Sequence, residues 1–242
     1  MTHEIIDHAF ILAAGEGRRL RPYTDHCPKP MVKLGGKPII DYTIDKLIAA
    51  GVTTITVNLH YMADTLAAHL QKRTDVHINL SFEDKLLDTG GGLANALDTM
   101  NGRPFYIISG DAFWVDHPHE DTLPALAAQW DTETTDLLLL LQPADNMKLT
   151  HGVGDYAFDD NGIPVRILDK TGTHMFTSIR IAHPRLFDGC PEGAFSFLQL
   201  MDKVEAEGRL RAVIHKGDWH HISTPEELER VDKALTESRN VA

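Results

Sequence analysis

The chain has 242 residues, of which 43% are hydrophobic and 24% charged, and its formal net charge is −12. These values are typical of a globular protein that buries a full core, and the length suits one α/β domain. The acidic balance, with no cluster of Lys or Arg, argues against a nucleic-acid partner but not against a nucleotide, which one local loop can hold.

The two cysteines, Cys27 and Cys190, lie far apart in the sequence, and we expect both to be reduced thiols in a cytoplasmic protein. The N-terminus lacks a basic region followed by an apolar stretch, so no signal peptide is expected. The most apolar run, Leu137–Leu141, is too short to span a bilayer. We therefore expect no membrane partner, while the oligomeric state is not indicated.

Strand-like and helix-like segments alternate through the first 140 residues. Short apolar runs predict strands at 9–13, 55–59, 76–82, 105–108 and 137–141. Apolar residues at helical spacing predict helices at 39–50, 62–72 and 93–100, and residues 123–130 lead into the last strand. The alternation favours a Rossmann-like, mainly parallel sheet with helices on both faces. Ligands bind at the carboxyl ends of such strands, where Gly15 and Asp111 fall.

The second half of the chain has a different pattern. Short strand-like pieces occur at 156–158, 164–168 and 176–181, separated by turn-like residues at 159–162 and 171–173. They predict antiparallel hairpins in a small insertion beside the core. Helices are expected at 195–207 and 225–237, the second capped by Thr224 with Pro225 at its first position. No repeat or linker is present, so we expect one domain over residues 1–242.

Residues 12–33, LAAGEGRRLRPYTDHCPKPMVK, form the most informative segment. Gly15 and Gly17 let the backbone turn closely and point its N–H groups at an anion. Arg19 and Lys29 add positive charge, so the loop suits a triphosphate. A dinucleotide-binding loop needs a third glycine where Leu20 stands, and a P-loop ends in Gly-Lys-Ser/Thr, so both of these motifs are excluded.

With Pro22 and the Pro28-Lys29-Pro30 run, this segment resembles the signature of the sugar-1-phosphate nucleotidyltransferases. These enzymes join a nucleoside triphosphate to a sugar 1-phosphate and release pyrophosphate. The resemblance implies the nucleotide-diphospho-sugar transferase fold and catalytic roles for Arg19, Lys29 and Asp111. It also implies nucleotide contacts from the residues of this first segment: Leu12, Ala13, Ala14, Gly15, Gly17, Arg19 and Lys29.

A second motif, Leu87 to Gly92, follows Glu83. Three glycines before the helix expected at Leu93 would let the backbone lie flat against a ligand, although a flexible turn is the alternative. In the resembled family this loop lies against the nucleobase. The resemblance therefore implies nucleotide binding by Glu83, Thr89, Gly90 and Gly91, with Glu83 positioning the loop.

Two further motifs concern a metal ion. Asp111 follows an apolar strand and a glycine, and the resembled family uses this Gly-Asp pair for Mg²⁺. The family's second ligand is the Asp of a Trp-x-Asp pattern, where this chain has His221, and Ser223 stands at a glycine position. Imidazole suits Mn²⁺ or Co²⁺ better than Mg²⁺. Either His221 is the second metal ligand, or it does not bind metal.

The second half resembles the N-acetylmuramate-1-phosphate uridylyltransferases of cell-wall recycling, through segments at 154–156, 176–179, 183–190 and 193–195. This implies sugar binding by Gly154, Asp155 and Ser178, although Ser178 replaces a usual glycine. Mannose- and heptose-1-phosphate guanylyltransferases share the first three motifs and remain the alternative. A non-catalytic nucleotide-sugar-binding relative is the alternative of another class. It is favoured by His221 and disfavoured by the intact catalytic residues.

Overall fold

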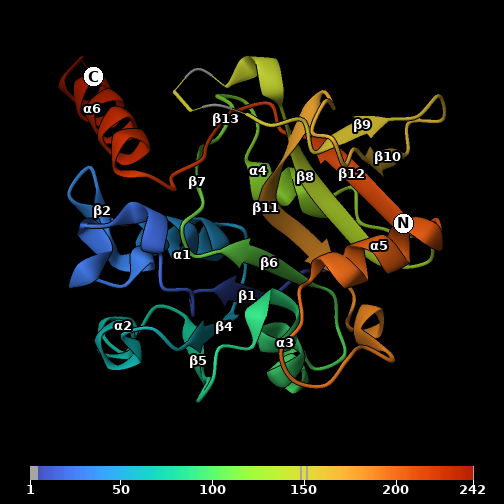
Figure 1. Ribbon diagram of the computed structural model, residues 1–242, viewed down its shortest axis with the longest axis horizontal. Coiled ribbons are helices and arrows are strands. Elements are labelled where there is room, and N and C mark those ends of the chain that lie inside the picture. Colours follow the sequence, from blue (N-terminus) through green and yellow to red (C-terminus); the bar gives the residue numbers. More distant parts are fainter. Residues whose placement is uncertain (1–4, 148, 151, 242) are drawn as a thin grey trace.

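The computed structural model describes residues 5–147, 149–150 and 152–241. These residues form a mixed sheet of nine strands, with the order β10-β9-β11-β6-β1-β4-β5 and with β8 and β12 joined to it through β11 (Figure 1). The strands are β1 His8–Leu12, β4 Thr54–Leu59, β5 His77–Phe82, β6 Phe105–Ser109, β8 Leu137–Pro143, β9 Tyr156–Phe158, β10 Pro164–Arg166, β11 His174–Ala182 and β12 Leu210–Ile214.

The centre of the sheet is parallel: β1 pairs with β4 and β6, and β4 pairs with β5. Strand β11 runs antiparallel between β6 and β8, and β9 and β10 form an antiparallel hairpin. The mainly parallel α/β fold is therefore confirmed. The antiparallel segment that the sequence placed beside the core is continuous with the main sheet, because β11 pairs with strands of both halves of the chain.

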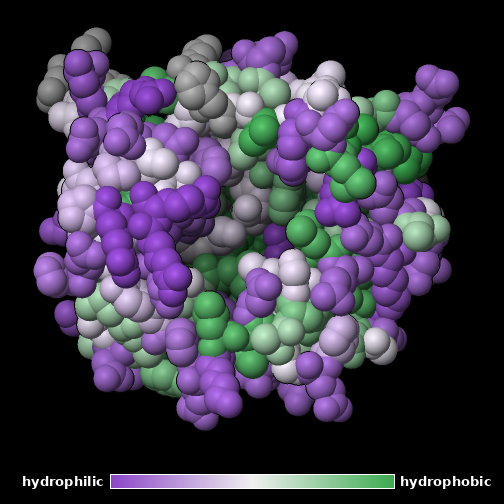
Figure 2. All heavy atoms as spheres, viewed as in Figure 1, coloured by the Kyte–Doolittle hydropathy of each residue, from purple (hydrophilic) through white to green (hydrophobic). Residues whose placement is uncertain are grey.

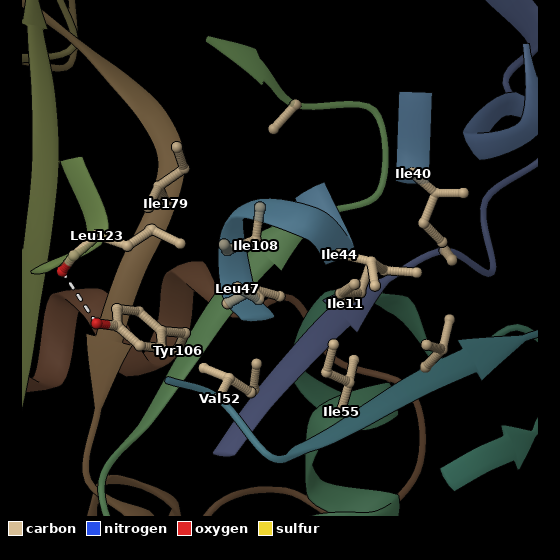
Figure 3. Close-up of a cluster of buried hydrophobic side chains, with 14 of the residues drawn as sticks. Ile11, Ile40, Ile44, Leu47, Val52, Ile55, Tyr106, Ile108, Leu123 and Ile179 are labelled. Atoms are coloured by element: carbon tan, nitrogen blue, oxygen red, sulfur yellow. Dashed lines mark hydrogen bonds between the residues drawn. The ribbon is translucent and has the colours of Figure 1, made fainter. Parts of the chain in front are cut away.

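Helices cover both faces of the sheet (Figure 1). Alternate residues of each strand point to opposite faces, so Ile11 and Ile108 enter one core cluster while Phe10 and Ile107 enter the other. Helices α1 Ile39–Ala49, α2 Ala63–Leu70 and α4 Thr122–Ala127 pack in the first cluster, and α3 Asp88–Asn95 and α5 Leu198–Ala206 in the second. Figure 3 shows the first cluster, where the Tyr106 hydroxyl donates to the carbonyl of Leu123 over 2.9 Å.

A third, smaller cluster packs residues near the C-terminus against the segment that follows β1. Ile222 and Leu228 pack there with Leu20 and Phe113. This side of the molecule holds helix α6 Pro225–Val241 and two small sheets, β2 Lys33–Leu34 with β3 Lys37–Pro38, and β7 Phe113–Val115 with β13 Asp218–His220. The packing brings the segment before α6 beside the N-terminal glycine loop. No described helix is both long and apolar enough to cross a membrane.

The start of α6 agrees with the sequence prediction. The Thr224 hydroxyl accepts from Glu227 N at 3.3 Å, and the Glu227 carboxylate accepts from Thr224 N at 3.1 Å. This reciprocal arrangement is a capping box, which satisfies two backbone donors that a helix start leaves open. Glu227 also accepts from the hydroxyl of Ser223 at 2.9 Å. The Ser223 side chain is therefore fixed by the helix start.

Candidate active site

A cavity of about 540 Å³ opens at the carboxyl ends of β1, β4 and β6. Figure 2 shows this face of the molecule hollowed near its centre, over the end of β6. The lining combines small residues of the first motif with charged and polar side chains from four other segments. These residues are Leu12, Ala13, Ala14, Gly15, Gly17, Arg18, Arg19, Lys29, Pro30, Asn58, Leu86, Asp88, Thr89, Ser109, Asp111 and Ser223.

The two glycines of the first motif, Gly15 and Gly17, lie in different surroundings. Gly17 has φ +62°, in the left-handed region, and a Cβ there would lie 2.9 Å from Lys29 Cβ. A Cβ on Gly15 would have no atom within 4 Å, because Gly15 faces the open cavity. The carbonyl of Gly17 accepts from the hydroxyl of Thr24 at 2.9 Å. The loop is thus held at Gly17 and open at Gly15.

Lys29 and Asp111 bring opposite charges together beside this loop. Lys29 starts a 3-10 turn, Lys29–Met31, and its Nζ donates to the carboxylate of Asp111 at the end of β6. The two side chains are 14% and 31% exposed, so both are held in place but can be reached from the cavity. A phosphate entering the cavity can therefore bind Lys29.

The triglycine motif differs from its prediction. The helix expected at Leu93 begins at Asp88 as α3, so the three glycines lie within it, and the expected 93–100 helix ends in a 3-10 turn, Leu97–Met100. This segment needs glycines because the helix packs closely against its neighbours, and it is not a flexible loop. A Cβ on Gly90 would lie 2.3 Å from the Phe195 ring, and one on Gly91 would lie 2.2 Å from a backbone carbonyl oxygen, that of Gly193. Gly90 and Gly91 therefore stand behind the cavity wall, while Thr89 lines it.

Asn58 is a functional candidate that sequence reasoning missed. It is 3% exposed, and its amide oxygen accepts from Ala13 N at 2.7 Å. Its amide nitrogen donates to Glu83 at 2.7 Å, and the second oxygen of Glu83 accepts from Leu87 N at 2.9 Å. Asn58 and Glu83 thus join the first and second motifs. The available signal was a single amide side chain near the end of the β-rich segment that forms β4.

His221 does not line the cavity, but it interacts electrostatically with Asp111, Lys29 and Arg19, which do. Its ring stacks on Trp219 with 5.8 Å between centroids, and its backbone N donates to Thr150 Oγ1 at 3.1 Å. Burial lowers the pKa of His221, and the opposing pull of Glu227 and Asp111 does not restore it. The neutral imidazole is the form that can coordinate a metal ion.

The residues expected to bind the sugar do not line this cavity. Gly154 lies against Gly172, whose carbonyl oxygen a Cβ would approach to 1.8 Å. The Asp155 carboxylate pairs with Lys170 and accepts from Phe176 N at 3.1 Å. Ser178 has φ +63° at a register shift in β11. These three residues therefore shape the β9–β11 region through their own contacts.

The donor set bears on the kind of metal that could bind. Among the described residues, no group of three or more His, Cys, Asp or Glu could hold a metal ion by itself. Mg²⁺ is commonly held by one or two carboxylates together with waters and substrate phosphates. The single carboxylate of Asp111 fits an ion that is shared with a substrate, and it does not fit a closed structural site.

The chain is similar to known proteins over most of its length. The family model described as "Nucleotidyl transferase" matches residues 8–153. An N-acetylmuramate alpha-1-phosphate uridylyltransferase of Caulobacter vibrioides is 34% identical over 95% of this chain and 97% of its own length. Mannose-1-phosphate guanyltransferase beta-A of Xenopus laevis is 29% identical over 91% of this chain and 62% of its own length.

Among solved structures, a UDP-glucose pyrophosphorylase complexed with UDP-glucose superposes with a TM-score of 0.79. The match covers 97% of this chain and 100% of that chain, at 16% sequence identity. At this identity the likeness shows a shared fold.

Proposed function

Since this chain belongs to the nucleotidyl transferase family, we propose that it transfers the uridylyl group of UTP to N-acetylmuramate 1-phosphate and releases pyrophosphate, as a step of peptidoglycan recycling. The observation that carries the proposal is the meeting of the open Gly15 loop with the Lys29–Asp111 pair in one cavity. A loop of backbone N–H groups beside a cation and a carboxylate suits a reaction at a phosphoanhydride.

In this proposal an oxygen of the sugar phosphate attacks the α-phosphorus in line. A bond forms between them, and the bond from the α-phosphorus to the bridging oxygen of the β-phosphate breaks. The backbone of the Gly15–Gly17 loop and Arg19 hold the departing pyrophosphate, while Lys29 neutralises charge that builds on the α-phosphate. Asp111 would hold Mg²⁺, or Mn²⁺ or Co²⁺ where His221 is a second ligand, and such an ion supplies positive charge to the substrate phosphates.

The nucleobase would lie against the start of α3. Thr89 lines the cavity there, and Leu86, which is 45% exposed, offers an apolar surface at the rim. Asn58 and Glu83 keep this wall at a fixed distance from the phosphate loop, since they are hydrogen-bonded to both motifs. The geometry is thus preorganised for a nucleotide whose base and phosphates bind at once.

The choice of uridine and N-acetylmuramate rests on the relative that matches this chain over nearly the full length of both proteins. Guanylyl transfer to mannose 1-phosphate is the second candidate, supported by a relative that extends well beyond the matched region. A protein that only binds nucleotide sugars has less need of the Lys29–Asp111 arrangement.

The test is pyrophosphate release from UTP, GTP, CTP and dTTP, each offered with N-acetylmuramate, N-acetylglucosamine and mannose 1-phosphates. We expect UTP with N-acetylmuramate 1-phosphate to react fastest. A clear preference for GTP with mannose 1-phosphate would favour the second candidate. No release from any pair, with nucleotide sugars still bound, would favour the non-catalytic alternative. The Lys29→Ala protein, purified in parallel, controls for contaminating activity.

A further inference from the structure

Arg180 is a buried cation without a counter-ion. The residue is 3% exposed, and its Nε has no hydrogen-bond partner. In the described part of the chain no carboxylate contacts it, and burial lowers the pKa of Arg180 to about 9. An isolated buried charge is strongly unfavourable unless it is paired. Its presence therefore points to an anion that is not part of the protein.

Two aromatic rings hold the guanidinium in place. Its carbon lies 4.0 Å from the centroid of Phe197 and 5.5 Å from that of Phe176. Such contacts orient a guanidinium but leave its in-plane N–H donors open. The nearby Tyr156 hydroxyl is a second buried polar atom without a partner. The Tyr156 hydroxyl and the Arg180 guanidinium, both without a hydrogen-bond partner, thus lie close together in the interior beside β9 and β11.

Arg180 and the two rings around it do not line the cavity, but the pairing of β11 with β6 places Arg180 near its edge. Arg180 stands opposite Ile107 in the β11–β6 pair, and Ser109, two residues further along β6, lines the cavity. Diagonal neighbours on one sheet face are about 7–8 Å apart, within the length of an extended arginine side chain. Phe197 is also tied to the cavity wall, because its backbone N donates to Thr89 Oγ1 at 3.0 Å.

The outer end of the guanidinium is open. Its two Nη atoms have no hydrogen-bond partner among the described residues, yet only Nε is both unpartnered and fully buried. The small exposed fraction of Arg180 therefore includes its Nη atoms. Arg180 is paired with Ile107, which precedes the end of β6, whereas the Lys29–Asp111 pair lies just beyond that end. In the proposed reaction Lys29 binds the reacting phosphate, so the anion at Arg180 would be a different group of the substrate.

We propose that Arg180 binds the carboxylate of the acceptor sugar and makes the protein select an acidic sugar 1-phosphate. The inference rests on the proposed function. N-acetylmuramate is N-acetylglucosamine with a lactyl ether, so the two sugars differ by one carboxylate-bearing group. A guanidinium pairs with a carboxylate through two parallel hydrogen bonds, which gives both strength and orientation. Arg180 is then the specificity residue that reads this difference.

The test compares the natural protein with Arg180→Met, which removes the charge and keeps an apolar side chain between the rings. We expect kcat/KM for N-acetylmuramate 1-phosphate to fall about 10- to 100-fold, the usual loss for a hydrogen bond to a charged group. The value for N-acetylglucosamine 1-phosphate should change by less than about threefold, because that sugar lacks the carboxylate. Arg180→Lys should lie between, since it keeps the charge without the planar fork.

Arg103→Met is the matched control, because Arg103 is exposed at the other end of β6 and pairs with Asp7. The unfolding midpoint of Arg180→Met should equal or exceed that of the natural protein, since no ion pair is lost. Equal losses with both sugars would assign Arg180 to the phosphate or to the fold, and unchanged discrimination would remove it from the site. Should Arg180→Met not fold, discrimination by Arg180→Lys decides between the same results. If the natural protein is inactive with N-acetylmuramate 1-phosphate, the proposed function is wrong, and this inference fails with it.

Discussion

Lys29 and Asp111 are 82 residues apart in sequence and form an ion pair in the lining of the cavity. The pair joins the glycine-rich first motif to the end of β6. It keeps a cation and an anion ready at one point, so that a substrate phosphate and its metal ion can each bind the opposite charge. Preorganised charge of this kind accelerates phosphoryl chemistry without a covalent intermediate.

Replacing Lys29 by Ala should reduce kcat about 100-fold or more, while the dissociation constant of UTP should rise less than about tenfold. The reason is that Lys29 stabilises negative charge that develops mainly in the transition state. Pyrophosphate release gives the first quantity and calorimetric titration the second. Lys33→Ala is the control, since Lys33 is an exposed neighbour. Equal losses in both quantities would make Lys29 a simple ground-state anchor.

Two glycine substitutions should separate fold from function. Gly91→Ala should destabilise the protein by about 2 kcal/mol or more, because its Cβ would meet the backbone oxygen of Gly193. Gly15→Ala should leave the unfolding midpoint nearly unchanged, because its Cβ enters open space, but should weaken triphosphate binding in the cavity. Thermal unfolding and UTP titration of both variants check this. Loss of stability at Gly15, with intact binding, would contradict the assignment of its loop.

His221→Asp should change the metal requirement. A carboxylate adds one negative charge and a hard oxygen ligand near Asp111, so the variant should need less Mg²⁺ than the natural protein. The advantage of Mn²⁺ or Co²⁺ should shrink, since imidazole is the better ligand for these ions. Rates against metal concentration give the comparison. Identical responses of both proteins would place His221 outside the coordination sphere.

Acid should destabilise the protein partly through His215. This buried ring can donate from Nδ1 to Gln142 at 2.8 Å and accept at Nε2 from Thr122 at 3.0 Å, and burial lowers its pKa to about 4. Above about pH 6.5 the ring is neutral in both states and its contribution is complete. As pH falls towards 4 the unfolded chain takes up the proton first, so up to about 3 kcal/mol of stability is lost.

Denaturant unfolding between pH 7 and pH 4 measures this loss. His215→Gln should show a shallower decline, whereas His77→Gln, at an exposed position, should follow the natural protein. Parallel declines in all three proteins would remove His215 as a source of acid sensitivity.

Local sequence patterns sufficed for the parallel strands, the Thr224 cap and the positions of Gly15 and Asp111 at strand ends. They failed where contacts between residues far apart in the sequence determine the local structure. The glycines of α3 look like a loop in sequence, because the residues that require them, Gly193 and Phe195, are about 100 residues away. The bonds of Asn58 and the unpaired charge of Arg180 likewise depend on strands that only the folded sheet places side by side.

The most direct measurement is phosphorus NMR of the protein mixed with UTP, N-acetylmuramate 1-phosphate and Mg²⁺. The account predicts that the signals of both substrates decline together, and that pyrophosphate and a UDP-sugar appear in equal amounts. Without the sugar phosphate, UTP should remain intact. Persistence of both substrates, or release of pyrophosphate with UMP in place of the UDP-sugar, would contradict nucleotidyl transfer to this acceptor.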